Sequence, residues 1–291
     1  MKTVSQILVL SISLLLIGCK SDIRTKHVKN QGLSSANEIK GKALLDAAWK
    51  AQGLDKLKQH QVYSFHGHDT WKGILGSIGK VWPEKNMHLD FKYEIGSFDG
   101  QVEFTSGKKK GRKSGIQNWK YYEIESDTIF MKPNSKVQFG LSAFQYFVEM
   151  ADRLRHAPII LYAGEKTFRN KTYDLVFCTW NNIKPQKDVD QYIAWINKET
   201  GLVEFTQYTI RENFMKMPGA KIFYGGIEYT NNKSIDGILI PHTQTVYAFN
   251  LKTNQRKFIH QLEVSNFEFD AFSPEALKID KSISEGGDFK P

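Results

Sequence analysis

The segment Tyr192-Ile193-Ala194-Trp195-Ile196-Asn197-Lys198-Glu199-Thr200-Gly201-Leu202-Val203 decides the fold of this chain. It opens with an unbroken apolar run from Tyr192 to Ile196. Successive side chains of a strand point to opposite faces, so this strand carries apolar side chains on both. The polar residues Asn197 to Gly201 then predict a tight turn. We therefore expect an antiparallel hairpin, and both of its faces must be covered.

Alternating apolar and polar residues predict more strands on either side of this hairpin. The clearest is Val62–Trp71, where Tyr63, Phe65 and Trp71 share one face. The other strand-like stretches are residues 79–81, 87–93, 102–104, 121–124, 173–180, 191–197, 202–210, 221–229, 238–249 and 258–269. Short turn signals such as Asp99-Gly100, Asn231-Asn232 and Asp236-Gly237 separate them, which predicts antiparallel meanders.

Helical spacing of apolar residues occurs in residues 36–52 and 142–155. In the first helix the apolar stripe comprises Ile39, Ala43, Leu44, Ala47, Ala48 and Ala51. Two helices cannot cover both faces of so many strands, and a sheet of this size twists and curls. The sequence therefore predicts a mainly β (α+β) fold: a strongly curved antiparallel sheet whose apolar concave face is plugged by the N-terminal and the mid-chain helix.

In a curved open sheet, the apolar core and the lining of a cavity are the same surface. Large aromatic side chains on the predicted strands and on the mid-chain helix are therefore the candidates for binding an apolar ligand. These candidates are Phe65, Trp71, Phe147, Phe177, Trp195, Phe205 and Tyr247.

The N-terminus has the layout of an export signal: Lys2, an apolar run from Ile7 to Ile17, and small residues after it. The run is too short to span a bilayer. It ends in Leu16-Ile17-Gly18-Cys19, which resembles the lipobox of bacterial lipoproteins. That resemblance implies cleavage before Cys19 and attachment of fatty acyl chains to its thiol, which anchor the protein to a membrane. An ordinary signal peptide with a coincidental cysteine is the alternative.

These features predict a division of the chain into a lipoprotein signal peptide at 1–18, a flexible tether at 19–37, a folded body at 38–272 and a tail at 273–291. Lys20 follows the cysteine, in the place where an Asp would resemble a signal for retention in the inner membrane. We therefore expect an outer-membrane lipoprotein that faces either the periplasm or the cell surface.

The formal net charge of +9 favours contact with an anionic membrane. An exported protein of this kind is not expected to bind nucleic acid. The densest basic run, Lys108-Lys109-Lys110-Gly111-Arg112-Lys113, fits a solvated hairpin tip, or else contact with lipid head groups or an acidic partner. Apart from Cys19 the sequence has only Cys178, which lies in an apolar strand and is expected to be a buried structural thiol.

The sequence offers weak candidates for catalysis. His66 and His68 share a strand face and could both reach one metal ion, with His88, His242 or His260 as a third ligand, while Asp69 points away. Two ordinary surface histidines are the alternative. Gly-x-Ser-x-Gly, phosphate-loop and dinucleotide motifs are absent. Asp188 and Asp190 are expected to form a solvated pair. We therefore expect neither enzyme activity nor a cofactor.

The order of these elements resembles the LolA/LolB-like superfamily of outer-membrane lipoprotein carriers and receptors, over residues 36–272. The hairpin at 192–203 and the segment Asp236-Gly237-Ile238-Leu239-Ile240-Pro241 match the hairpin style of that superfamily. The resemblance implies an incomplete barrel with an apolar cavity for acyl chains.

The leading functional hypothesis is therefore a monomeric, membrane-anchored protein that binds an acyl chain, a lipid or a lipoprotein in its cavity, in outer-membrane lipid or lipoprotein handling. Two alternatives stay open. One is an exported metal-dependent hydrolase that uses His66 and His68. The other is a structural outer-membrane lipoprotein whose own side chains fill the cavity.

Overall fold

The computed structural model describes residues 22–131, 134–211, 223–250, 255–280 and 282–283. The predicted signal peptide and Cys19 lie outside these residues. Within these ranges the strands form one antiparallel sheet of thirteen in the order β6-β5-β4-β3-β2-β1-β13-β12-β11-β10-β9-β8-β7. The strands are β1 (Val62–Trp71), β2 (Asn86–Glu94), β3 (Gly100–Phe104), β4 (Lys113–Gln117), β5 (Lys120–Glu125), β6 (Thr128–Phe130), β7 (Ile159–Phe168), β8 (Lys171–Thr179), β9 (Gln191–Asn197), β10 (Val203–Tyr208), β11 (Phe223–Ile235), β12 (Ile238–Asn250) and β13 (Arg256–Phe269).

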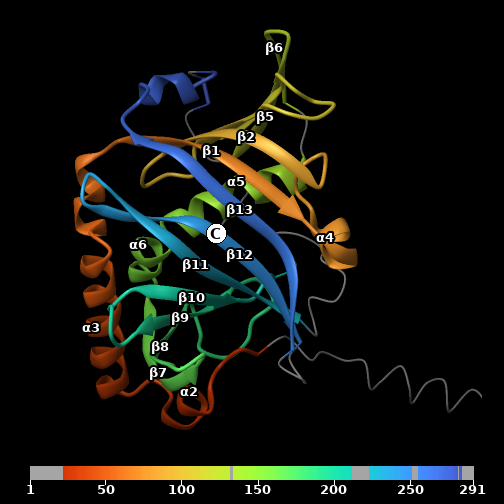
Figure 1. Ribbon diagram of the computed structural model, residues 1–291. Helices are drawn as coiled ribbons and strands as arrows, with labels where there is room; N and C mark the ends of the chain where they lie inside the picture. Colours follow the sequence, from red (N-terminus) through yellow and green to blue (C-terminus); the bar gives the residue numbers. More distant parts are fainter. Residues whose placement is uncertain (1–21, 132–133, 212–222, 251–254, 281, 284–291) are drawn as a thin grey trace, which may run out of the picture.

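The sheet consists of two meanders, β1–β6 and β7–β13, joined where β1 pairs with β13. The two edge strands, β6 and β7, are therefore consecutive in the sequence but lie at opposite ends of the sheet. The connection between them must cross the sheet, and it does so as α5 (Ser135–Val148) and α6 (Met150–Arg155). The sheet curves around these two helices without closing (Figure 1). The predicted incomplete barrel is thereby confirmed.

We call the side of the sheet that faces α5 and α6 the inner face, and the opposite side the outer face. Strand β9 shows why both are apolar: Ala194 and Ile196 belong to the inner core, whereas Ile193 and Trp195 belong to a separate outer cluster. The two-sided apolar strand predicted from the sequence is therefore confirmed. Part of the outer face is covered by Ile23 and by Val28 of α2 (Lys26–Gln31).

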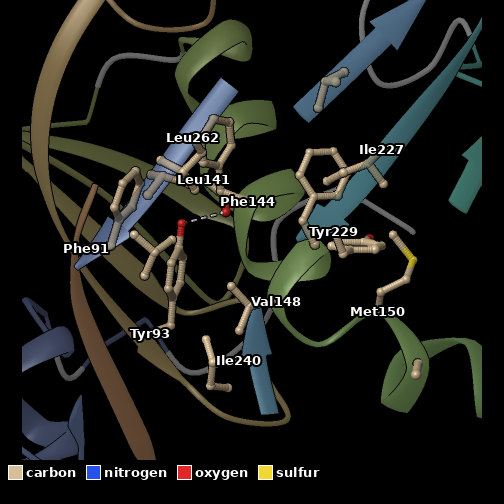
Figure 2. Packing of buried hydrophobic residues seen from close by; sticks show 14 of the residues in the cluster. Phe91, Tyr93, Leu141, Phe144, Val148, Met150, Ile227, Tyr229, Ile240 and Leu262 are labelled. Carbon is tan, nitrogen blue, oxygen red and sulfur yellow. Dashed lines mark hydrogen bonds between the residues drawn. The ribbon is translucent and has the colours of Figure 1, made fainter. Parts of the chain in front are cut away.

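The inner core is densely packed in the first meander. Figure 2 shows Phe91, Tyr93 and Leu262 of the sheet against Leu141 and Phe144 of α5. The Tyr93 hydroxyl donates to the Leu141 carbonyl over 3.0 Å, which ties β2 to this helix and satisfies a buried polar group.

The helix α3 (Ser35–Ala51) confirms the predicted first helix, and its Ser34 cap accepts from the Asn37 amide. The predicted stripe is only partly confirmed. Ala48 is buried and Leu44 packs against the inner core, but Ile39 is 70% exposed while Gly41 and Leu45 are buried. Gly41 decides which side packs: a Cβ there would lie 2.6 Å from the Leu161 carbonyl carbon of β7. The missing side chain lets the helix approach the edge strand.

The ordered body is longer than residues 38–272. Residues 22–37, which were expected to be a tether, contain α2 and the start of α3, and Val28 is fully buried. After residue 272, Leu277 of η2 (Pro274–Leu277) is buried, and Lys278 bonds Glu94 and Asp99. Both segments are polar on average, which is why the sequence did not predict them as part of the folded body. Single buried side chains, Val28 and Leu277, hold them against it. The signal peptide at 1–18 lies outside the described residues and stays a prediction.

Three local predictions differ from the structure. Residues 79–81 are not a strand, since Gly79 ends α4 (Gly73–Gly79) and Lys80 and Val81 follow it outside any strand. Asn231-Asn232 is not a turn but lies within β11, where Asn231 has a φ of 56°. The mid-chain helix begins at Ser135, with Asn134 as its cap, and not at Ser142. Asn231-Asn232 resembled a turn in the sequence because Asn favours positive φ, but Asn also adopts positive φ outside turns.

A buried ion pair lies where α5 meets α6. Glu149 separates the two helices and is 2% exposed. Its carboxylate accepts from Arg153 over 2.8 Å and from Gln145 over 3.1 Å. Burial raises the pKa of Glu149, and the Arg153 guanidinium opposes that rise. Arg153 also donates to the Ser97 carbonyl over 2.7 Å, so the pair ties the helix junction to the loop after β2.

Candidate functional site

An apolar cavity lies on the inner face between α5 and the strands β9 and β10; we call it the inner pocket. It holds about 100 Å³, within a space of about 710 Å³ that is partly open to solvent. A cavity of about 100 Å³ can hold only part of a ligand, and the rest of that ligand would extend toward the opening. The pocket is lined by Phe98, Trp119, Phe139, Ser142, Ala143, Tyr146, Phe147, Trp180, Asp190, Tyr192, Tyr208, Thr209 and Ile210.

Aromatic rings form the walls of the inner pocket. Tyr192 and Tyr208 face each other across the β9–β10 pairing, and Tyr146 of α5 stacks on Tyr192 at 5.5 Å and 16°. Phe98 and Trp119, from two turns of the first meander, lie 4.5 Å apart. Rings that pack against one another are held in place, so these walls are formed before any ligand arrives. The two meanders and α5 therefore all contribute to this pocket.

Asp190 is the charged residue of the pocket lining. Its side chain is 12% exposed and accepts from the Thr209 hydroxyl over 2.8 Å, with the Arg211 guanidinium 4.0 Å away. Burial raises the pKa of Asp190 to about 7. The expectation of a solvated Asp188–Asp190 pair is wrong, because Asp188 is exposed and Asp190 is not. Two hydrogen bonds hold Asp190 in this position: the Thr179 hydroxyl donates to its backbone carbonyl, and the Thr209 hydroxyl donates to its carboxylate.

The seven residues proposed from the sequence do not line one cavity. Phe147 lines the inner pocket. Phe65 and Trp71 are packed in the inner core, and Phe177 is fully buried in the outer cluster. Trp195, Phe205 and Tyr247 line a different cavity, on the outer face.

The ligand-binding candidates chosen from the sequence do not include Tyr146, Tyr192 and Tyr208. One available signal was that Tyr192 and Tyr208 belong to neighbouring strands with a short turn between them, where cross-strand aromatic pairs form. In a strand with two apolar faces, however, the alternation cannot tell which face is turned toward a helix.

The histidines do not assemble a metal site. His66 Nε2 lies 3.2 Å from His88 Nδ1, but His66 Nδ1 is bonded to Asp90 and His68 to Asn86 and Glu263. The other two histidine candidates lie elsewhere: His260 bonds Asp69, and His242 bonds the Ile240 carbonyl. Within the described ranges, no three His, Cys, Asp or Glu side chains are grouped so that they could hold a metal ion.

Cys178 is free and fully buried, as predicted, and burial raises the pKa of its thiol. Residues 108–110 lie in the turn between β3 and β4, consistent with a hairpin tip. No helix among the described residues combines the length and the apolar character needed to cross a membrane.

The sequence matches no family model, and no curated protein is significantly similar to it. Among solved structures, a DUF1329 family protein from Desulfovibrio piger aligns with a TM-score of 0.52 at 13% identity, over 83% of this chain and 98% of that one. A LolA superfamily protein from Nitrosomonas europaea aligns with a TM-score of 0.47 at 8% identity, over 81% of this chain and 96% of that one. At such identities the likeness concerns the fold and not the activity.

The architecture that the resemblance implied, an incomplete barrel, is confirmed by the strand order and by the helical crossing between the two sheet edges. The chain has an open antiparallel sheet wrapped around the helices that join its edges, a fold similar to that of the DUF1329 family protein.

Proposed function

We propose that this chain is an outer-membrane lipoprotein that binds the apolar part of a lipid or acyl-chain ligand in the inner pocket. The observation that carries the proposal is the pocket itself, whose walls are mostly aromatic. Among the described residues that line it, Asp190 supplies the one carboxyl, and burial raises the pKa of that carboxyl to about 7. Apolar walls with few polar groups favour an apolar ligand, because burying each ligand methylene contributes about 0.8 kcal/mol.

The anchoring part of the proposal rests on the sequence. Leu16-Ile17-Gly18-Cys19 supplies a thiol at the end of an apolar run, where a lipid anchor would be attached. Two or more acyl chains give stable membrane attachment. A binding site held close to a membrane would exchange lipid with that membrane over a short distance.

Filling the inner pocket should weaken the binding of an apolar ligand. Ala143 lies on α5, lines the pocket and is only partly buried, so Ala143→Trp places an indole in the cavity without disturbing the densely packed core. We expect the affinity for the neutral fluorescent probe N-phenylnaphthylamine to fall about tenfold or more, measured by fluorescence titration. The control is Ala47→Trp, on the exposed side of α3. Equal probe binding by both variants and the wild type would refute the pocket assignment.

Binding of the same neutral probe should weaken as the pH rises above about 7. A bound apolar group removes the remaining water around Asp190, which disfavours the carboxylate and raises its pKa further in the complex than the value of about 7 in the free protein. Above that pH, binding takes up a proton, so the affinity falls by up to about tenfold per pH unit.

Asp190→Asn should remove this pH dependence, whereas Asp188→Asn, on the exposed neighbour, should keep it. A probe affinity that increases with pH, or that varies equally in both variants, would show that Asp190 does not face the bound molecule.

Lipidation should require Cys19 alone. We expect Cys19→Ser to abolish metabolic labelling with radioactive palmitate and to release the protein from membranes after cell fractionation. Cys178→Ser is the matched control, since the Cys178 thiol is fully buried in the sheet and should not be acylated. Labelling that survives Cys19→Ser would disprove the lipobox assignment.

A further inference from the structure

A second cavity, of about 230 Å³, lies on the outer face of the second meander; we call it the outer groove. Its aromatic lining comes from Phe168, Trp195, Phe205, Tyr247 and Phe249. Trp195 and Phe205 belong to the same strands as Tyr192 and Tyr208 but point to the opposite side. The sheet itself therefore separates the outer groove from the inner pocket.

The aromatic rings that line the outer groove are packed against one another and against the backbone. The rings of Trp195 and Phe205 lie 5.3 Å apart, and Phe168 stands nearly perpendicular to both, at 87° and 85°. Gly226 of β11 forms part of its floor, where a Cβ would lie 2.4 Å from the ring of Phe249. The glycine lets that ring lie against the backbone. The aromatic surface is thus fixed in shape without a ligand.

Three cationic side chains stand over these rings. Lys166 Nζ lies 4.3 Å from the centre of the Trp195 ring, and Arg256 Cζ lies 4.7 Å from that of Tyr247. Arg169 Cζ lies 5.0 Å from the centre of Phe168. Cations held over aromatic faces keep their charge at the edge of an apolar surface.

Carboxylates balance only part of this charge. Glu228 accepts from Arg169 over 2.6 Å and lies 3.6 Å from Arg256. Glu204 is bonded to Lys171, Asn197 and Tyr173. Lys166 forms no ion pair within the described part of the chain, and burial lowers its pKa. A half-buried ammonium without a carboxylate favours an incoming anion.

We propose that the outer groove binds a single amphiphile with an anionic head group, separately from the ligand of the inner pocket. The apolar part of the molecule lies on Trp195, Phe205 and Phe249, and the anionic head accepts from Lys166 and Arg256. The surplus of positive charge selects an anionic over a cationic amphiphile, and the aromatic floor selects an amphiphile over a small anion.

The test compares two soluble amphiphiles with the same chain length and opposite charge, laurate and dodecyltrimethylammonium, below their critical micelle concentrations. Isothermal titration calorimetry is performed on the purified protein carrying Ala143→Trp, so that the inner pocket does not contribute. We expect one laurate per chain, bound at least about tenfold more tightly than dodecyltrimethylammonium.

Lys166→Gln should weaken laurate binding about tenfold, and so should Arg256→Gln. The control is Lys198→Gln, because Lys198 forms an exposed ion pair with Glu165 outside the groove. Equal binding of the two amphiphiles, or laurate binding that Lys166→Gln does not change, would overturn the proposal.

Sedimentation with phosphatidylglycerol vesicles decides between a single molecule and a membrane surface. Vesicle binding that depends on Lys166, together with no binding of monomeric laurate, would show that the groove contacts a lipid surface and would also overturn the proposal. These calorimetric results do not depend on whether the inner pocket binds a ligand, because every titration uses the protein with Ala143→Trp.

Discussion

Replacing Arg153 with alanine is expected to lower the free energy of unfolding by about 3–5 kcal/mol at pH 7, because it leaves a buried carboxylate without its counter-charge. Glu149 is 2% exposed, and Arg153 is the cation bonded to it, over 2.8 Å. The variant also loses the bond from Arg153 to the Ser97 carbonyl and the stacking on Phe98 at 3.9 Å. Denaturant unfolding followed by circular dichroism measures the effect.

The loss in Arg153→Ala should shrink as the pH falls toward 5. Burial already raises the pKa of Glu149, and removing the guanidinium raises it further. A folded-state pKa above the unfolded value makes the folded protein bind a proton more readily, so its stability increases on acidification. Adding Glu149→Gln should recover part of the stability at pH 7.

The control for this pair is Arg155→Ala. Arg155 is bonded to Asp46 at the surface and should contribute about 1 kcal/mol or less. If Arg153→Ala is no more destabilising than Arg155→Ala, the ion pair does not hold the helix junction.

Replacing Asp69 with alanine should cost a similar amount, about 3–5 kcal/mol, because it orphans three buried donors. The fully buried Asp69 carboxylate accepts from Trp71 Nε1 at 2.6 Å, Trp82 Nε1 at 2.8 Å and His260 Nδ1 at 2.9 Å. It thereby links β1 to β13 and to the loop before β2. The near-ultraviolet circular dichroism of the two indoles should change together with the loss of stability.

Asp90→Ala is the matched control, since Asp90 is bonded to His66 on the outer face and its side chain is 53% exposed. It should change the free energy of unfolding by about 0.5 kcal/mol. Comparable losses in the two variants would mean that the Asp69 cluster is not a structural centre.

Much of the sheet could be predicted from the sequence, because the period of two in its strands reflects burial directly. Residues 62–71 and 191–197 coincide with β1 and β9. Strands β4, β6 and β7 were not among the predicted strands, and Thr128–Phe130 is too brief to show alternation. The face of α3 was misread, because close packing on β7 required Gly41 and not a larger apolar residue.

The binding surfaces could be predicted only in kind. Aromatic residues on two-sided strands marked a surface that binds apolar groups, but the period of two cannot show which face the helices cover. The choice of Trp195 over Tyr192 therefore fell on the outer face. Asp190 gave no local signal either, since its partners Thr209 and Arg211 lie in the segment that follows β10.

The most direct test of the apolar inner pocket is native mass spectrometry of the purified protein, performed with Lys166→Gln so that the outer groove contributes less. The protein should carry one copurified apolar molecule that organic solvent extracts, and adding Ala143→Trp should eliminate that species. An identical bound species at the same occupancy with and without Ala143→Trp, or no bound molecule in either protein, would contradict ligand binding in the inner pocket.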